Sequence, residues 1–158
     1  MIRLVLVRHA KSDWGDPDLD DHDRPLNARG LRDAPVMARR LADTGFRPDV
    51  IVSSTAVRAR TTAEAFGAEL GTAVDLEPIL YGAPPRTLLA VAAATRARSV
   101  VLVAHDPGMS TLAGDLSGDG VSRMPTCAVA TFTWTDAQWD TVDALAPADW
   151  TFDAPGLA

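Results

Sequence analysis

Three short apolar runs constrain the fold of this 158-residue chain more than any other feature of its sequence. They cover residues 2–7, 50–52 and 100–104. Continuous apolar runs of this length are typical of strands buried on both faces, which occur mainly in the parallel sheets of α/β proteins. Ligands of such proteins bind outside the carboxyl ends of the strands. We therefore expect one crevice where the three runs end.

Each of these runs is followed closely by polar residues whose side chains can bind ligands or take part in catalysis. Arg8 and His9 follow the first run, and His105 follows the third. The second run ends in a pair of serines, and the helix expected after them carries Arg58. Guanidinium groups bind phosphate oxygens in pairs, and histidine can act as a nucleophile. The pattern therefore predicts a phosphate site that contains its own nucleophile.

Strand and helix patterns alternate along most of the chain, which predicts a single α/β domain over residues 1–158. A helix with Gly45 as its stop is expected before the second strand, and Pro35 either places its start near Ala34 or kinks it. Further helices are expected over about residues 56–70, 85–93 and 109–115.

The carboxyl-terminal part of the chain changes character. The pattern over residues 127–134 and 138–145 predicts two strands joined by a turn, which would add an antiparallel edge to a mostly parallel sheet. A further short strand of this sheet is expected at residues 74–76. Residues 146–158 are expected to be a loosely packed tail. The expected architecture is a three-layer α/β/α fold.

Composition and charge exclude several classes of function. The net charge of −6 argues against nonspecific binding to nucleic acid, which requires a basic surface. No stretch approaches the roughly 20 apolar residues of a membrane span, and the first apolar run is too short for a signal peptide. Cys127 is the sole cysteine, so no intramolecular disulfide can form, and we expect a small buried residue there. These features favour a cytoplasmic protein.

Phosphoryl transfer gives each residue at the strand ends an expected role. His9 would attack phosphorus, Arg8 and Arg58 would bind the phosphoryl oxygens, and His105 would donate a further hydrogen bond.

A metal is not expected. Residues 16–23 resemble the opening of a calcium loop but lack its glycine and terminal glutamate, and the arginines would oppose a zinc ion held by His9, His22 and His105.

Four segments resemble one known family. Residues 7–12, Val-Arg-His-Ala-Lys-Ser, resemble the Arg-His-Gly signature of the histidine phosphatase superfamily, also called phosphoglycerate-mutase-like. Residues 54–62 match its Ser-x-x-x-Arg-Ala-x-x-Thr segment, and residues 103–107 match its late strand and histidine. Residues 24–30 resemble the Arg-Pro-Leu-x-x-x-Gly stretch of the SixA-like branch, the phosphohistidine phosphatases.

The resemblance implies a fold and a function. His9 would carry the transferred phosphoryl group, Arg8, Arg58 and His105 would surround it, Arg24 would line the entrance, and Ser12 would join the phosphate-binding set. SixA-like members remove phosphate from histidine in signalling proteins, without a metal or other cofactor. The implied partners are a phosphorylated protein or a small phosphorylated compound, with inorganic phosphate or sulfate as pocket ligands and neither nucleic acid nor membrane.

Two positions depart from the family pattern. Ala10 replaces a glycine, and no glutamate occupies the position of the general acid: with Tyr81-Gly82 aligned, that position falls on Pro78, one residue after Glu77. Glu77 and Asp16 are the candidate acids, with Asp13 and Asp106 as further substitutes.

The missing acid bears on the substrate. A site without a dedicated acid suits cleavage of a P–N bond, because an imidazole leaving group, with a pKa of about 6.5, takes up a proton readily. Two alternatives stay open: a small-molecule phosphomonoesterase of the same fold, and a noncatalytic module that binds phosphorylated ligands.

Overall fold

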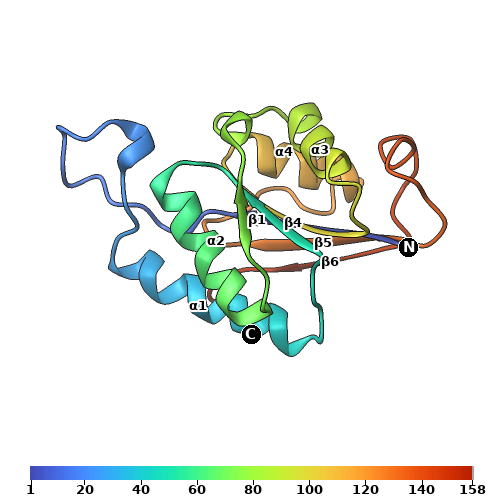
Figure 1. Ribbon diagram of the computed structural model, residues 1–158, viewed down its shortest axis with the longest axis horizontal. Coiled ribbons are helices and arrows are strands. Elements are labelled where there is room, and N and C mark those ends of the chain that lie inside the picture. The colour runs from blue at the N-terminus through green and yellow to red at the C-terminus, as the bar shows by residue number, and fades with distance from the viewer. Residues whose placement is uncertain (158) are drawn as a thin grey trace.

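A six-stranded sheet with the order β3-β2-β4-β1-β5-β6 forms the centre of the computed structural model, which describes residues 1–157 (Figure 1). The four strands β1 to β4 are parallel, whereas β5 and β6 run antiparallel at one edge. The predicted mostly parallel sheet with an antiparallel carboxyl-terminal edge is confirmed. The strands are β1 (Ile2–Arg8), β2 (Val50–Ser53), β3 (Val74–Leu76), β4 (Ser99–Ala104), β5 (Val129–Trp134) and β6 (Asp149–Asp153).

Helices cover both faces of the sheet, which gives the expected three layers. α1 and α2 lie on one face, and α3 and α4 lie on the other (Figure 1). Two short 3-10 helices, η1 and η2, lie in the loops before α1 and after β3. The helices are α1 (Ala28–Asp43), α2 (Val57–Leu70), α3 (Pro85–Ala94), α4 (Gly108–Leu116), η1 (Asp21–Asp23) and η2 (Pro78–Leu80). Within residues 1–157, none of the helices has the length and apolar character needed to span a membrane.

Strand β1 explains why the apolar runs are continuous. Its side chains alternate between the two layers: Leu4 and Leu6 pack in the core with α3 and α4, and Val5 and Val7 pack in the core with α1 and α2. All four side chains are fully buried. A strand segment covered on both faces needs apolar residues at every position, and residues 4–7 show that pattern.

Helix α1 begins earlier than one of the two expectations placed it. The side chain of Asn27 accepts a hydrogen bond from the Gly30 amide at 2.9 Å, and this cap starts the helix at Ala28. Pro35 therefore lies inside the helix, and a start near Ala34 is wrong. The carbonyl that loses its donor to the proline belongs to Leu31, which is exposed, so solvent can replace the missing bond.

The strand predicted over residues 138–145 is wrong, because that segment consists of turns. Its apolar side chains pack against the domain without forming a strand. The indole nitrogen of the partly buried Trp139 donates a hydrogen bond to the carbonyl of Ala97 at 2.6 Å, and Val142 is buried in the core. The last strand is β6, which pairs with β5. The segment 146–158, expected to be a loosely packed tail, thus contains a paired strand followed by the buried Ala154.

Gly30 fixes the position of α1 against the loop after β1. A Cβ at this position would lie 2.2 Å from the backbone oxygen of Lys11, and the same oxygen accepts a hydrogen bond from the Asn27 amide at 3.0 Å. The first turn of α1 therefore approaches the loop that carries the Arg-His signature as closely as backbone atoms allow.

We expect Gly30→Ala to destabilise the protein even though alanine is the better helix former. The clash with Lys11 should outweigh a helix-propensity gain of about 1 kcal/mol and leave a net loss of about 2 kcal/mol. Gly118→Ala is the control, because a Cβ there meets nothing within 4 Å and only the left-handed backbone conformation has a cost. Urea unfolding measures both variants. A Gly30→Ala protein at least as stable as the wild type would contradict the close approach.

Candidate active site

Two histidine rings meet where the neighbouring strands β1 and β4 end. Arg8 lies opposite Ala104 in the parallel register, so His9 and His105 are each one residue beyond the paired strands. A backbone hydrogen bond of 3.1 Å from the His9 amide to the Ala104 carbonyl extends the pairing into the site. The ring centroids are 5.1 Å apart, and both residues are buried. The structure thus brings together the two histidines that the sequence analysis selected.

Arg8 and Arg58 are held beside these rings by protein oxygens. Nη1 of Arg8 donates to the carbonyl of Met124 at 2.9 Å and lies 3.4 Å from a carboxylate oxygen of Asp106. Arg58, in the first turn of α2, donates from Nη1 to the backbone oxygen of Asp21 at 2.6 Å and from Nη2 to its carboxylate at 2.9 Å. Both guanidinium groups are fixed at their outer ends.

Three buried nitrogens of these residues point to an anionic ligand. Within residues 1–157, the buried side-chain nitrogens or oxygens without a hydrogen-bond partner are Nε of Arg8, Nε of Arg58 and Nδ1 of His105. A buried polar group left without a partner costs about 1–3 kcal/mol, so each such group calls for an explanation. All three belong to residues beside the histidine pair, so an oxyanion bound there is the candidate partner for them. We call this region the anion hollow.

His9 is held in the form that a nucleophile requires. Its Nδ1 lies 2.8 Å from the carbonyl oxygen of Ala10, and since a carbonyl can only accept, Nδ1 carries the proton. The lone pair is then on Nε2. Burial, followed by the nearby guanidinium groups, lowers the pKa of His9 to about 4, against a hydrogen bond to Ala10 that raises it. The ring is therefore neutral at pH 7 with a free nitrogen.

Ser54 is compatible with a His105 ring that carries its proton on Nδ1. The Ser54 hydroxyl oxygen accepts from the amide of Ala56 at 3.2 Å and lies 2.8 Å from Nε2 of His105. The hydroxyl can donate its own proton to Nε2, and in that arrangement the ring proton is on Nδ1, the atom without a partner. Burial, followed by the charge of His9, lowers the pKa of His105 to about 3. His105 is therefore a neutral donor at pH 7.

Thr62 ties α2 to the loop that carries His9. Its hydroxyl accepts a hydrogen bond from the amide of Ala10 at 3.0 Å and donates one to the carbonyl of Arg58 at 2.8 Å. This contact explains the last residue of the Ser-x-x-x-Arg-Ala-x-x-Thr segment in physical terms. Ala10 is fully buried, so the methyl group that replaces the usual glycine hydrogen is accommodated.

Arg24 and Ser12 lie together beside the anion hollow. Nη1 of Arg24 donates to the Ser12 hydroxyl at 2.8 Å, and Nε donates to the carboxylate of Asp21 at 3.1 Å. The guanidinium of Arg24 also stacks 3.3 Å from the ring centre of Trp14, which is otherwise exposed. Arg24 thus connects an exposed aromatic ring to the carboxylate that binds Arg58.

Glu77 and Asp16, the two first candidates for the general acid, hydrogen-bond elsewhere, whereas Asp106 lies beside Arg8. The carboxylate of Glu77 accepts from the amide of Ile79 at 3.3 Å, and that of Asp16 accepts from the amide of Asp18 at 3.0 Å. Among residues 1–157, neither carboxylate bonds to a side chain of the anion hollow. The same described part of the chain contains no group of three histidine, cysteine, aspartate or glutamate side chains that could hold a metal ion.

Three further residues lie beside the histidine pair: Asp21 and Tyr81, which the sequence did not indicate as site residues, and His22, which was considered only as a zinc ligand. The ring of Tyr81 lies edge-on to His105, with centroids 5.4 Å apart, and edge-on to His22 at 5.0 Å. The Tyr81 hydroxyl donates to Asp21. A signal existed for Asp21, since buried phosphate-binding arginines need carboxylates nearby, but several aspartates in the loop fit that requirement equally well.

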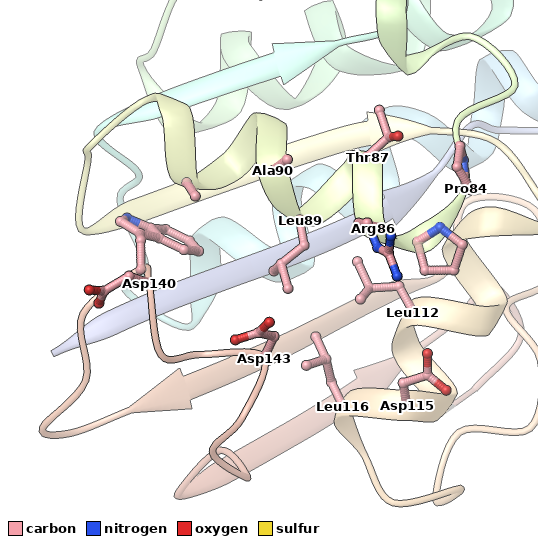
Figure 2. Close-up of a pocket in the computed structure, with 13 residues that line it drawn as sticks. Pro84, Arg86, Thr87, Leu89, Ala90, Leu112, Asp115, Leu116, Asp140 and Asp143 are labelled. Atoms are coloured by element: carbon pink, nitrogen blue, oxygen red, sulfur yellow. The ribbon is translucent and has the colours of Figure 1, made fainter.

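A separate groove of about 810 Å³ lies between α3, α4 and residues 139–143. Figure 2 shows Leu89, Leu112 and Leu116 inside it, with carboxylates such as Asp115 and Asp143 around them. Neither histidine of the pair and none of the three arginines lines this groove. Its chemistry is therefore distinct from that of the anion hollow.

Comparison with known proteins gives consistent matches. Residues 4–81 match the model of the histidine phosphatase superfamily (branch 1). A putative phosphohistidine phosphatase SixA from Agrobacterium tumefaciens is 33% identical, with a TM-score of 0.81 over 98% of this chain and 99% of that one. Another from Nakamurella multipartitia is 28% identical, with a TM-score of 0.78 over 99% and 97%. An uncharacterized Mycobacterium leprae protein is 34% identical over 74% of each chain.

Titration of the two buried rings tests the site geometry. The pKa values of His9 and His105, lowered to about 4 and about 3, predict that both rings stay neutral from pH 7 down to about pH 5. Tungstate, an anion that favours the protonated rings, should raise both pKa values. Histidine NMR signals recorded against pH measure this directly. Rings that both titrate near pH 6.5 in the free protein would contradict their burial.

Proposed function

The chain belongs to the histidine phosphatase superfamily, and from this premise we propose that it removes phosphate from phosphohistidine in proteins by way of a phosphoryl group on His9. One observation carries the proposal: a neutral histidine with a free Nε2 belongs to the same cluster as three buried nitrogens that lack partners, Nε of Arg8, Nε of Arg58 and Nδ1 of His105. Such preorganised donors stabilise the charge that spreads over the phosphoryl oxygens during transfer.

In the first step, the phosphoryl oxygens accept hydrogen bonds from Nε of Arg8, Nε of Arg58 and Nδ1 of His105. Nε2 of His9 attacks phosphorus with its lone pair, and the P–N bond of the substrate breaks. The electron pair of that bond returns to the substrate imidazole, whose other nitrogen carries a proton taken from solvent. The carbonyl of Ala10 stabilises the positive charge that forms on the His9 ring.

In the second step, water replaces His9. The water oxygen bonds to phosphorus, the P–Nε2 bond breaks, and its electron pair restores the neutral ring. The released inorganic phosphate keeps the two hydrogens of the water, so that atoms and charge balance. The donors that stabilised the first transfer act again on the same three oxygens.

The protonation states near the hollow support an imidazole leaving group. The hydrogen bond from Tyr81, together with those from Arg58 and Arg24, holds the pKa of Asp21 well below its usual range, so this carboxylate has no proton to donate. The same hydrogen bond raises the pKa of Tyr81. An alkoxide leaving group would need a proton from the protein, whereas imidazole obtains one from solvent.

Trapping the intermediate tests the nucleophile. Incubation with a protein carrying labelled phosphohistidine, followed by an alkaline quench, should leave label on His9, because phosphohistidine is stable in alkali. His9→Ala should carry none. His22→Ala is the matched control: it removes a nearby histidine that bonds to Thr55 rather than to a residue of the hollow, and it should still be labelled. Label on another residue, or turnover that survives in His9→Ala, would contradict the proposal.

The choice of substrate is tested separately. General acid catalysis typically contributes about 100-fold or more, so kcat/KM for a phosphohistidine peptide should exceed that for an alkyl phosphate by at least about 100-fold. Steady-state phosphate release from a phosphohistidine peptide and a panel of alkyl phosphates measures the ratio. Comparable values for the two classes would identify a general phosphomonoesterase of the same fold instead.

A further inference from the structure

Asp21 forms hydrogen bonds with three side chains from different parts of the chain. Its carboxylate accepts from Nη2 of Arg58, from Nε of Arg24 and from the Tyr81 hydroxyl, and its backbone oxygen accepts from Nη1 of Arg58. One residue of η1 thus connects the loop before α1 to α2 and to the loop after β3. Asp21 is half exposed, whereas the side chain of Arg58 is only 7% exposed.

The geometry of the guanidinium group shows what this contact achieves. A guanidinium offers one pair of donors at its end, from Nη1 and Nη2, and another along its side, from Nε and one Nη. Asp21 binds the end of Arg58 with both of its oxygen types, and Nε is left buried without a partner. We propose that Asp21 is a positioning residue, which orients Arg58 so that its Nε edge faces the phosphoryl group.

Arg8 shows a related arrangement, in which Nη1 makes both of the contacts with protein oxygens. Its Nη1 bonds to the carbonyl of Met124 and lies beside the carboxylate of Asp106, and again Nε is buried without a partner. Two arginines from different elements therefore show one arrangement. Each is bound by protein oxygens through its Nη atoms, and each has an Nε that is buried without a partner.

Fixing Arg58 in advance matters because its side chain is long and flexible. Ordering a free arginine costs about 2 kcal/mol in rotamer entropy, and a donor already in place spares that cost when the transition state forms. The carboxylate is suited to this task because Tyr81 and the arginines keep it ionised, as its lowered pKa indicates. The effect of Asp21 on the reaction should therefore pass through Arg58.

This inference rests on the proposed anion hollow but not on phosphohistidine as the substrate. It is tested with Asp21→Asn, which keeps the backbone contact and the shape of the side chain but removes the charge. Asp20→Asn is the matched control, since it makes the same change of charge one residue away, at a side chain with no capping hydrogen bond. Two readouts are used: the affinity for tungstate by calorimetry, and kcat and KM on an aryl phosphate and on a phosphohistidine peptide.

We expect Asp21→Asn to weaken tungstate binding by about tenfold and to lower kcat by more than it raises KM, the loss expected for one charge-assisted hydrogen bond. Asp20→Asn should stay within about twofold of the wild type on every readout. The combination with Arg58→Lys separates positioning from a structural role: if Asp21 acts through Arg58, adding Asp21→Asn to Arg58→Lys should cause no further loss.

Three results would overturn the inference. Asp21→Asn could match Asp20→Asn, its losses could add in full to those of Arg58→Lys, or it could bind tungstate more tightly. The last result would mean that the carboxylate competes with the anion for Arg58. Failure of the phosphohistidine assay alone would count against the proposed substrate and leave the tungstate result to decide the role of Asp21.

Discussion

The parallel pairing of β1 with β4 is the constraint on which the site depends. It places Arg8 opposite Ala104, so that the next residue of each strand is a histidine, and the two rings lie 5.1 Å apart. A slip of one residue would turn one ring toward the opposite face of the sheet. Because the helical layers cover both faces, the strand ends offer the main opening where polar groups of several elements can meet. The register of the backbone pairing therefore determines that the two histidine rings lie side by side.

Burial then determines how the charges around the rings are arranged. The histidines are neutral because desolvation disfavours their charged forms, and this leaves one nitrogen lone pair on His9 and one donor on His105. The arginines stay charged, and carboxylates bind them from outside: Asp106 lies at Arg8, and Asp21 binds both Arg24 and Arg58. With two carboxylates and three guanidinium groups, this cluster has a net positive charge, which attracts an anion.

Periodicity and strand ends make part of this site predictable from the sequence. His9, His105 and Arg58 could be placed because each lies just past an apolar run, and the alternation of patterns gave the order of strands and helices. Asp21 could not be placed, since it lies 37 residues from Arg58 and 60 from Tyr81, in a loop without periodicity. The strand β6 was not predicted for a related reason. An edge strand is held mainly by backbone hydrogen bonds to one neighbour, so its sequence shows only a weak alternation of apolar and polar residues.

The arginines also explain why a carboxylic acid is a poor proton donor in this pocket. Asp21 binds both Arg24 and Arg58, and the hydrogen bond from Tyr81, together with those from the two arginines, holds the pKa of its carboxyl well below its usual range. Glu77 caps η2 instead, where its carboxylate accepts a hydrogen bond from the Ile79 amide at 3.3 Å. These contacts support the proposal of phosphohistidine as the substrate, because its imidazole leaving group takes up a proton from solvent.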